Sequence, residues 1–469
     1  GRPCVVSHPP DMLRSAVLLG LFAAVFCASY MQLKDYDPVL EYDTVHRLAK
    51  VTNDDVFPGI SKRNSYSGYI NVDEDTNSNH FFWFFEAENG NKDAPVVIWM
   101  SGGPGCSDEI SIFNENGPWW LFAGMEVPEE NPFNWCQEYH CLYFDNPVGA
   151  GFSYTENPRG FPTDEDRIAE WYVSGLDSFF TYFSEYQGAS LSLFGESYGG
   201  HYVPCVGDYI SKHPTDMYTL ERIAVGDGMT YPEVQMGAVL DFAWGFGLID
   251  QLQRDELAPL QDRLVNAIAT ERWTESHTLF GELLSKVLYD AGEPNQYNVM
   301  NWDDAMGSFD TIHDYLMTEE ARDALHAGSI EWTACNDTVS IFLWNDYFSS
   351  SQQAVIDVLE AGIDVLIYSG NADLIITGLG QELWTYAMEW EGQEEFLAAT
   401  RGIWNATNTE TGKDEVCGTW KHSRGDHEGL GALSVALVYD SGHLVPQDQP
   451  LHAYAMMERY VTDDYLNYY

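Results

Sequence analysis

The strongest constraint on the fold of this chain is a Gly-Glu-Ser-Tyr-Gly motif at residues 195–199, directly after an apolar run, Leu191–Phe194. The run predicts the end of a buried strand, and a Gly-x-Ser-x-Gly motif after a strand is typical of a sharp strand-to-helix turn that carries a nucleophile. Glycines on either side let neighbouring backbone pass close by without a Cβ clash. Such a turn projects the Ser197 hydroxyl into a cleft and leaves the Tyr198 N–H free to bind an oxyanion. The motif alone also fits an ordinary glycine-rich turn.

An acid and a histidine follow two further predicted strands. Asp373 comes shortly after the strand Asp364–Gly370, and His443 comes shortly after the strand Leu433–Tyr439. The chain order Ser, Asp, His is the order of α/β-hydrolases and differs from the orders in chymotrypsin and subtilisin. Taken singly, the acid could be a turn former and the histidine a loop residue. All three together, in this order and each at a strand end, favour a catalytic triad.

The alternation of predicted elements indicates an α/β fold with a mostly parallel sheet. Continuous apolar strands are predicted at Ala94–Met100, Cys141–Asp145 and Arg222–Gly226, as expected for a sheet buried on both faces. In the next hundred residues few segments have the pattern of a strand. Apolar residues recur instead at helical spacing, for example at Leu252–Arg272 and Glu319–Ala327.

The predicted domain organisation follows from that change. Residues 30–230 form the first part of the core, residues 231–345 a helical cap insertion, and residues 346–469 the second part of the core. The insertion is therefore expected to separate the earlier strands from the last two.

Composition narrows the possible partners. With 45% hydrophobic residues the chain can build a large core, and its net charge of −51 argues against nucleic acid and anionic membrane surfaces as partners. The acidic residues are spread along the chain, which indicates a solvated acidic surface suited to a salty medium or an acidic compartment. No metal or cofactor is predicted, and a homodimer is compatible with the sequence.

The N-terminal segment resembles a secretory leader. Met12–Arg14 precedes an apolar run, Ala16–Ala28, that is too short for a comfortable membrane span, so residues 1–28 are predicted to be leader and signal peptide. Cleavage is expected near residues 27–29. A protein on this route is secreted, lysosomal or vacuolar, with no stable membrane span after the signal is removed. Sequons at Asn336 and Asn405 fit the same route.

A second glycine-rich segment, Ser101–Ser107, follows the strand that ends at Met100. Its glycines bring backbone N–H groups close to a neighbouring strand end, where a hydrolase builds the second half of its oxyanion hole. Gly-Gly-Pro-Gly is also ordinary turn chemistry.

These motifs resemble those of the serine carboxypeptidases, peptidases with an α/β-hydrolase fold that act on peptide C-termini. The resemblance extends from residue 64 to about residue 460, and within the family it is nearest to the vitellogenic-like branch. The matching segments are 102–107, 115–118, 145–154, 195–204, 225–228, 368–373 and 442–450.

The resemblance implies a role for each matching residue. Ser197 is implied to be the nucleophile, His443 the general base and acid, and Asp373 the residue that orients the histidine. The N–H groups of Gly103 and Tyr198 are implied to form the oxyanion hole. The substrate's terminal carboxylate is implied to be bound by Ser101, Gly102, Glu115 and Glu196.

The implied carboxylate site has two unusual features. Two acids can bind an anion if they hold a proton between them, and their like charges favour this by raising one pKa. In so acidic a chain, Glu115 and Glu196 could instead be ordinary surface acids. The family usually has Asn in place of Ser101, whose hydroxyl can still donate a hydrogen bond but reaches less far.

The oxidising route lets the cysteines be interpreted as disulfides. The resemblance implies a bond between Cys106 and Cys335. Cys136 and Cys141 are close enough in sequence for a local bond, which leaves Cys205 and Cys417 as a third pair. Metal ligation is not favoured in a secreted chain without Cys-x-x-Cys spacing.

Three functions are compatible with the sequence. The first is a serine-type carboxypeptidase that cleaves the C-terminal bond of peptides and proteins through an acyl-enzyme. The second is an acyltransferase that passes the acyl group to an alcohol; Glu196 disfavours it, because acyltransferase relatives often have Asp there. The third is a non-catalytic binding or protective protein, against which an intact triad argues.

Overall fold

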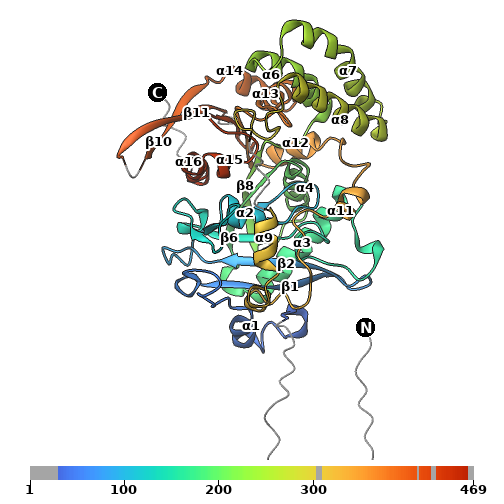
Figure 1. The fold of residues 1–469 in the computed structure, drawn as a ribbon. Helices are drawn as coiled ribbons and strands as arrows, with labels where there is room; N and C mark the ends of the chain where they lie inside the picture. Colours follow the sequence, from blue (N-terminus) through green and yellow to red (C-terminus); the bar gives the residue numbers. More distant parts are fainter. Residues whose placement is uncertain (1–29, 303–308, 409–410, 424–428, 463–469) are drawn as a thin grey trace, which may run out of the picture.

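A ten-stranded mixed sheet forms the centre of the computed structural model, which describes residues 30–302, 309–408, 411–423 and 429–462 (Figure 1). The predicted leader and signal peptide lie outside the described residues. Six central strands, β6, β3, β7, β8, β9 and β12, run parallel, and an antiparallel pair completes each edge. In sheet order the strands are β1 (Ser65–Asp73), β2 (Ser78–Phe85), β6 (His140–Phe144), β3 (Val96–Met100), β7 (Ala189–Glu196), β8 (Tyr218–Gly226), β9 (Asp364–Gly370), β12 (Leu433–Val438), β11 (Lys413–Ser423) and β10 (Gly402–Asn408).

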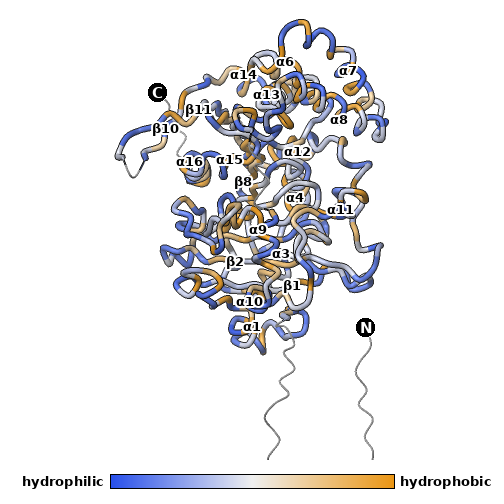
Figure 2. Tube along the Cα trace, in the orientation of Figure 1, coloured by the Kyte–Doolittle hydropathy of each residue, from blue (hydrophilic) through white to orange (hydrophobic). Residues whose placement is uncertain are grey.

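Helices cover both faces of the sheet, and this explains the continuous apolar strands. In β3, Val96, Ile98 and Met100 pack into one core with helices α3 and α4, whereas Val97 and Trp99 pack into a second core with α16. Because successive residues of a strand point to opposite faces, a strand between two cores is apolar throughout. Figure 2 shows the central strand β8 as hydrophobic.

The helices of the described residues are these, in chain order: α1 (Tyr42–Ala49), α2 (Asp108–Asn114), α3 (Glu165–Tyr182), α4 (Gly199–Lys212), α5 (Pro232–Gln235), α6 (Val239–Phe246), α7 (Gln251–Ala269), α8 (Trp273–Asp290), α9 (Phe309–Leu316), α10 (Glu319–Ala324), α11 (Asp337–Phe342), α12 (Gln352–Glu360), α13 (Gly378–Ala387), α14 (Gln393–Ala398), α15 (Val445–Asp448) and α16 (Pro450–Val461). Two short strands, β4 (Trp119–Trp120) and β5 (Glu129–Glu130), pair separately. None of the described helices is both long and apolar enough to span a membrane.

The helical segment predicted at residues 231–345 packs in two places. Helices α6, α7 and α8 form a third core through residues such as Leu240, Leu264 and Leu283, together with apolar residues of the loop after β9. Helices α9 and α10 instead join the second core of the sheet, and Figure 1 shows α9 over the sheet, away from α7. We therefore propose that the cap itself consists of α5–α8, a shorter segment than the sequence suggests.

The hairpin β10–β11 is the largest departure from the expected topology: its two strands follow β9 in the chain, but in the sheet they lie at the edge beyond β12. It projects from one side of the molecule in Figure 1. Its residues are mixed: Trp404 is fully buried, whereas Ile403 and Val416 are 46% and 52% exposed. With one face toward solvent, the hairpin has no continuous apolar run to indicate a strand.

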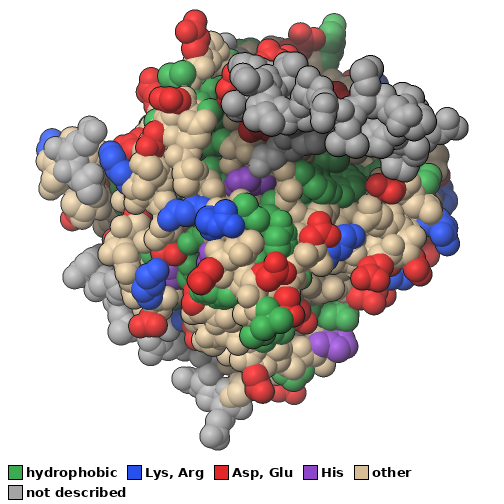
Figure 3. Space-filling view, turned by 90° about the horizontal axis from the view of Figure 1, so that it is seen from below, with side chains coloured by type: hydrophobic (Ala, Val, Ile, Leu, Met, Phe, Trp, Pro, Cys, Tyr) green, Lys and Arg blue, Asp and Glu red, His purple; other side chains and the backbone are tan. Residues whose placement is uncertain are grey.

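Acidic side chains lie scattered over the surface that Figure 3 shows rather than in one patch. This distribution agrees with the solvated acidic surface expected from the sequence. Repulsion between dispersed charges is weak in water, because exposed charges farther apart than about 10 Å are largely screened at moderate salt.

Two disulfide bonds are present among the described residues. Cys106 joins Cys335, which links the loop after β3 to the segment before α11, and Cys136 joins Cys141. Cys205 and Cys417 are free, so their predicted pairing is wrong. Cys205 lies on α4, which packs on the first core, while Cys417 belongs to the second core on the opposite face of the sheet. The sheet separates the two thiols.

Peptide mapping of the purified protein without reduction should reproduce this pattern. We expect one linked fragment that contains Cys106 and Cys335, and one that contains Cys136 and Cys141. After unfolding, a thiol reagent should label Cys205 and Cys417, because both are unpaired in the fold, where Cys205 is half-buried and Cys417 is buried. A fragment that links Cys205 to any other cysteine would contradict the assignment.

Candidate active site

Ser197 stands at a sharp turn between β7 and α4. Its backbone is left-handed, with φ of 58°, a conformation that is strained for a residue with a side chain. Three backbone hydrogen bonds hold the turn: Ser197 N donates to Gly226 O at 3.0 Å, and Ser197 O accepts from Gly200 N and Met229 N at 3.0 and 2.9 Å. The strained position is therefore fixed by the end of the neighbouring strand β8.

His443 and Asp373 form a buried pair at the same edge of the sheet. His443 Nδ1 lies 2.7 Å from Asp373 Oδ2, and the histidine and aspartate side chains are 3% and 0% exposed. An ionised carboxylate can only accept, so Nδ1 carries the proton and the neutral ring has its lone pair on Nε2. Nε2 is buried and has no hydrogen-bond partner among the described residues. It is therefore available to accept a proton from a substrate or a nucleophile.

The loop after β3 passes directly over the nucleophile turn. A Cβ on Gly102 would lie 2.6 Å from both Ser197 Cβ and Tyr198 N, so only glycine fits there. Gly103 has φ of 114°, which also favours glycine. This close approach places the backbone of the Gly102–Gly103 segment beside the N–H of Tyr198. Two backbone donors on either side of Ser197 are what an oxyanion hole requires.

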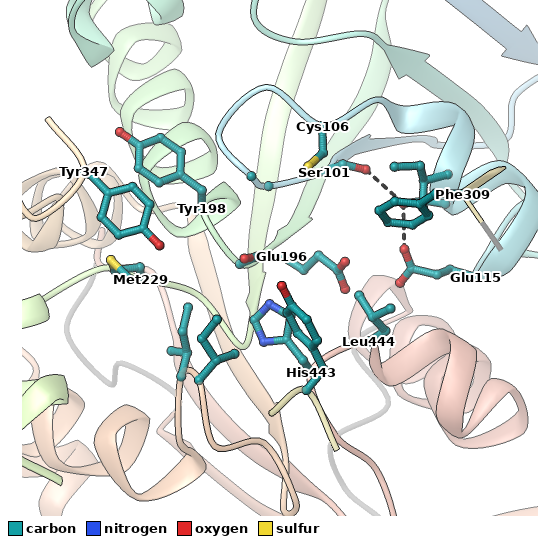
Figure 4. A pocket seen from close by; sticks show the side chains of 18 residues that line it. Ser101, Cys106, Glu115, Glu196, Tyr198, Met229, Phe309, Tyr347, His443 and Leu444 are labelled. Atoms are coloured by element: carbon teal, nitrogen blue, oxygen red, sulfur yellow. Dashed lines mark hydrogen bonds between the residues drawn. The ribbon is translucent and has the colours of Figure 1, made fainter. Parts of the chain in front are cut away.

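One cavity of about 130 Å³ collects the predicted residues of the site (Figure 4). Aromatic and aliphatic side chains, including Tyr347, Ile375 and Leu444, complete its wall, and Asp373 lies behind His443. The predicted residues that line the cavity are Ser101, Gly102, Gly103, Glu115, Glu196, Ser197, Tyr198 and His443. The acid and histidine groups here belong to this hydrogen-bonded arrangement, and we assign none of them to a metal ion.

Glu115 and Glu196 point toward each other across the cavity (Figure 4) and are 1% and 5% exposed. Burial raises the pKa of Glu115 to about 7, although hydrogen bonds from Ser111 and Glu196 oppose the shift. Burial, followed by the charge of Glu115, raises the pKa of Glu196 well above its usual range. The pair consequently holds a proton below neutral pH, and these residues are not ordinary surface acids.

A line of hydrogen bonds connects Ser101 to the acid pair. Ser101 Oγ lies 3.2 Å from Trp99 Nε1 and 2.9 Å from Ser111 Oγ, and Ser111 Oγ donates to Glu115 Oε1 at 2.7 Å. The indole N–H can only donate, and Ser111 gives its own hydrogen to Glu115. The Ser101 hydrogen therefore goes to Ser111 or, when a substrate is present, to an acceptor in the cavity.

The structure adds positioning residues that the sequence interpretation missed. Tyr297 O accepts from His443 N at 2.6 Å, and Asn298 Nδ2 donates to Asp448 Oδ2 at 2.9 Å. The same Asp448 oxygen accepts from Gly442 N at 2.7 Å. The loop after α8 thus supports the backbone on both sides of the histidine. No local pattern marks Tyr297 or Asn298, since they meet His443 only through the fold.

Comparison with known proteins places the chain in a family. The family model described as serine carboxypeptidase matches residues 57–463, most of the chain. The chain belongs to the serine carboxypeptidase family. It is a serine-type peptidase with an α/β-hydrolase fold, and the family and fold expected from the sequence are confirmed.

Individual relatives extend over most of the chain. The rat (Rattus norvegicus) protein named probable serine carboxypeptidase CPVL, from the vitellogenic-like branch, is 32% identical over 87% of this chain and 84% of its own length. Serine carboxypeptidase-like 48 of Arabidopsis thaliana is 31% identical over 86% of this chain and 79% of its own. Among solved structures, the prohormone-processing carboxypeptidase KEX1(delta)p of Saccharomyces cerevisiae superposes with a TM-score of 0.76 at 25% identity, covering 89% of this chain and 95% of that one.

Proposed function

We propose that this serine carboxypeptidase releases one residue at a time from peptide C-termini through an acyl-enzyme on Ser197. The observation that carries the proposal is that a hydrogen-bonded Asp–His pair, a strained serine and a buried, proton-sharing carboxyl pair all meet at one small cavity. The first two supply a nucleophile and its base. The carboxyl pair can bind the terminal carboxylate of a substrate, which would direct cleavage to the end of the peptide.

In the proposed reaction, His443 Nε2 takes the proton from Ser197 Oγ as that oxygen attacks the carbonyl carbon of the last peptide bond. The negative oxygen of the tetrahedral intermediate accepts hydrogen bonds from the N–H groups of Gly103 and Tyr198. The imidazolium, stabilised by Asp373, then protonates the departing amino group, and the acyl group stays on Ser197. Water, deprotonated by His443, attacks the ester in the second half and releases the shortened peptide.

The leaving residue carries a free carboxylate, and the acid pair is proposed to bind it. With one proton between Glu115 and Glu196, an O–H can donate to that carboxylate, and the Ser101 hydroxyl can turn from Ser111 to donate as well. An amidated C-terminus offers no anion to these donors. Burial strengthens such charge-assisted hydrogen bonds, which are roughly twice as strong as neutral ones.

Turnover of matched dipeptides tests the proposal. Substrates with a blocked N-terminus and either a free or an amidated C-terminus should differ in kcat/KM, with the free acid preferred by roughly 10-fold or more, since a charged hydrogen bond is worth about 1.5–3 kcal/mol. The released amino acid is measured directly. Equal rates for the free acid and the amide would contradict exopeptidase action. Transfer of the acyl group to an added alcohol in preference to water would indicate the acyltransferase.

We also propose that the protein follows the secretory route, to the outside or to a lysosome or vacuole. The leader at residues 1–28 and the two disulfides support this. Asn336 caps α11, with Oδ1 accepting from Thr338 N and Nδ2 donating to Gly149 O at 2.8 Å. A glycan on Asn336 would leave its Nδ2 with a single hydrogen, and the bond to Gly149 O needs that hydrogen. Asn405 lies on the projecting hairpin and is the less constrained glycosylation site.

A further inference from the structure

Asp227 occupies a tight turn at the end of β8, beside the triad. It is fully buried and left-handed, with φ of 42°, and it lies between Gly226 and Gly228. A Cβ on Gly226 would lie 2.3 Å from the Tyr368 ring, so the turn packs directly against that ring and only glycine fits there. The Asp227 backbone N–H donates to Tyr368 O at 2.8 Å. Burying a carboxyl group in this turn costs free energy unless the group is protonated or hydrogen-bonded to its neighbours.

The Asp227 side chain faces the aspartate of the triad. Oxygen atoms of Asp227 and Asp373 and a ring nitrogen of His443 all lie within 4.8 Å of one another. Two buried carboxyl groups this close favour a proton on one of them, because two like charges would repel each other. The other titratable groups that face Asp227 are Glu196, at the end of β7, whose charge opposes a second negative charge, and Tyr368, on β9, whose pKa burial and nearby acids raise so that the phenol stays neutral.

The hydrogen-bond donors show which carboxyl keeps the proton. Asp373 accepts from His443 Nδ1 at 2.7 Å and from Ile375 N and Ile376 N at 2.9 and 3.3 Å. Among the described residues, the Asp227 carboxyl accepts only from Gly370 N, which is shared between its two oxygens at 3.1 and 3.2 Å. Because hydrogen bonds from N–H groups stabilise the ionised form, Asp373 is the anion and Asp227 is the acid.

We propose that Asp227 is a positioning residue that stays protonated in the working enzyme and donates a hydrogen bond to the Asp373 carboxylate. The bond fixes the plane of that carboxylate against His443 and limits the negative charge at the imidazole to one unit. Burial, then the charge of Asp373, raises the pKa of Asp227 well above its usual range, which agrees with a retained proton. The inference rests on the proposed function, because it concerns the same triad.

The consequence is a second pH limit on turnover, separate from the Glu115–Glu196 pair. When Asp227 loses its proton at high pH, two carboxylates repel each other and Asp373 moves out of line with His443. The imidazolium is then held too strongly and donates its proton less readily to the leaving group. A substrate without a free carboxylate isolates this effect, since the acid pair has no anion to bind in that case.

The test is the pH dependence of kcat for an N-blocked amino acid ester with no free carboxylate. Wild-type kcat should fall by roughly tenfold per pH unit once Asp227 ionises. In Asp227→Asn this alkaline fall should disappear or move upward by at least one pH unit, because the amide N–H still donates to Asp373 and has no proton to lose. Asn also accepts the left-handed backbone. Asp227→Ala, which lacks the donor, should lower kcat by at least about tenfold with little change in KM.

Glu165→Gln is the matched control. Glu165 is also a buried carboxyl with a raised pKa, but it faces Asp346 instead of the triad, and its variant should keep the wild-type alkaline fall. An Asp227→Asn enzyme that retains that fall, or a folded Asp227→Ala enzyme with wild-type kcat, would overturn the inference.

A proton NMR measurement on the wild-type protein tests the role of Asp227 without depending on the folding of variants. In the wild-type protein, the downfield proton resonance of the His443–Asp373 hydrogen bond should shift as pH passes the ionisation of Asp227. A resonance that titrates only with His443 itself would contradict the role of Asp227. Absence of ester turnover by the wild type at every pH would instead contradict the proposed function, so the two failures are distinguishable.

Discussion

Replacing Ser197 with alanine should lower kcat on peptide substrates on the order of 10⁵- to 10⁶-fold, because acyl transfer loses its nucleophile. His443→Ala should have nearly the same effect. The double variant should be no worse than either single one, since members of a triad act as a unit. The measurement is single-substrate kinetics on protein whose thermal unfolding matches the wild type.

Ser192→Ala is a suitable control for this loss. Ser192 lies on β7, the strand that leads into Ser197, is fully buried, and its hydroxyl has no hydrogen-bond partner among the described residues. It lies away from the cavity that Ser197 lines. We expect its variant to keep near-normal activity. A folded Ser197→Ala protein with comparable activity would sink the nucleophile assignment.

The pH profile of KM should show the second-largest effect, through Glu115 and Glu196. With the pKa of Glu115 raised to about 7, the pair keeps its shared proton in acid and binds the substrate's carboxylate. As pH rises past that value Glu115 ionises and its charge repels the carboxylate, and the later ionisation of Glu196, whose pKa the charge of Glu115 raises, removes the last proton of the pair. KM for a peptide should therefore rise roughly tenfold per pH unit above neutrality, with little change in kcat, because the contact is made in the ground state and the transition state alike.

Two measurements separate this effect from the triad. His443 must be neutral to accept the serine proton, which lowers kcat in acid, so kcat/KM for peptides should peak on the acid side of neutrality. Glu196→Gln, which donates without a proton to lose, should flatten the alkaline rise in KM. Substrates without a free carboxylate should have an optimum at higher pH. If both substrate types gave the same profile, the role of the pair would be wrong even with the triad correct.

The sequence by itself determined the central sheet and the residues that gather at its edge. β9 begins and ends at the predicted residues, and β3 and β12 differ from prediction by one or two residues. Strands between two cores are apolar on both faces, and that pattern is visible without a structure. Because parallel strands end at the same edge of a sheet, residues just after β7, β9 and β12 had to meet there. Ser197, Asp373 and His443 are those residues.

Only the tertiary structure decided contacts that no local pattern encodes. The hairpin β10–β11 has one face in solvent and therefore lacks the apolar run of a central strand. Cys205 and Cys417 are an available pair in sequence, but the sheet lies between them. The proton that we propose for Asp227 depends on its burial beside Asp373, and strands far apart in the chain bring these two residues together. The spacing of apolar residues in the sequence indicates which face of a helix or strand is buried. It does not indicate which residue packs against that face, or the charge of that residue, because the folded chain alone brings the two together.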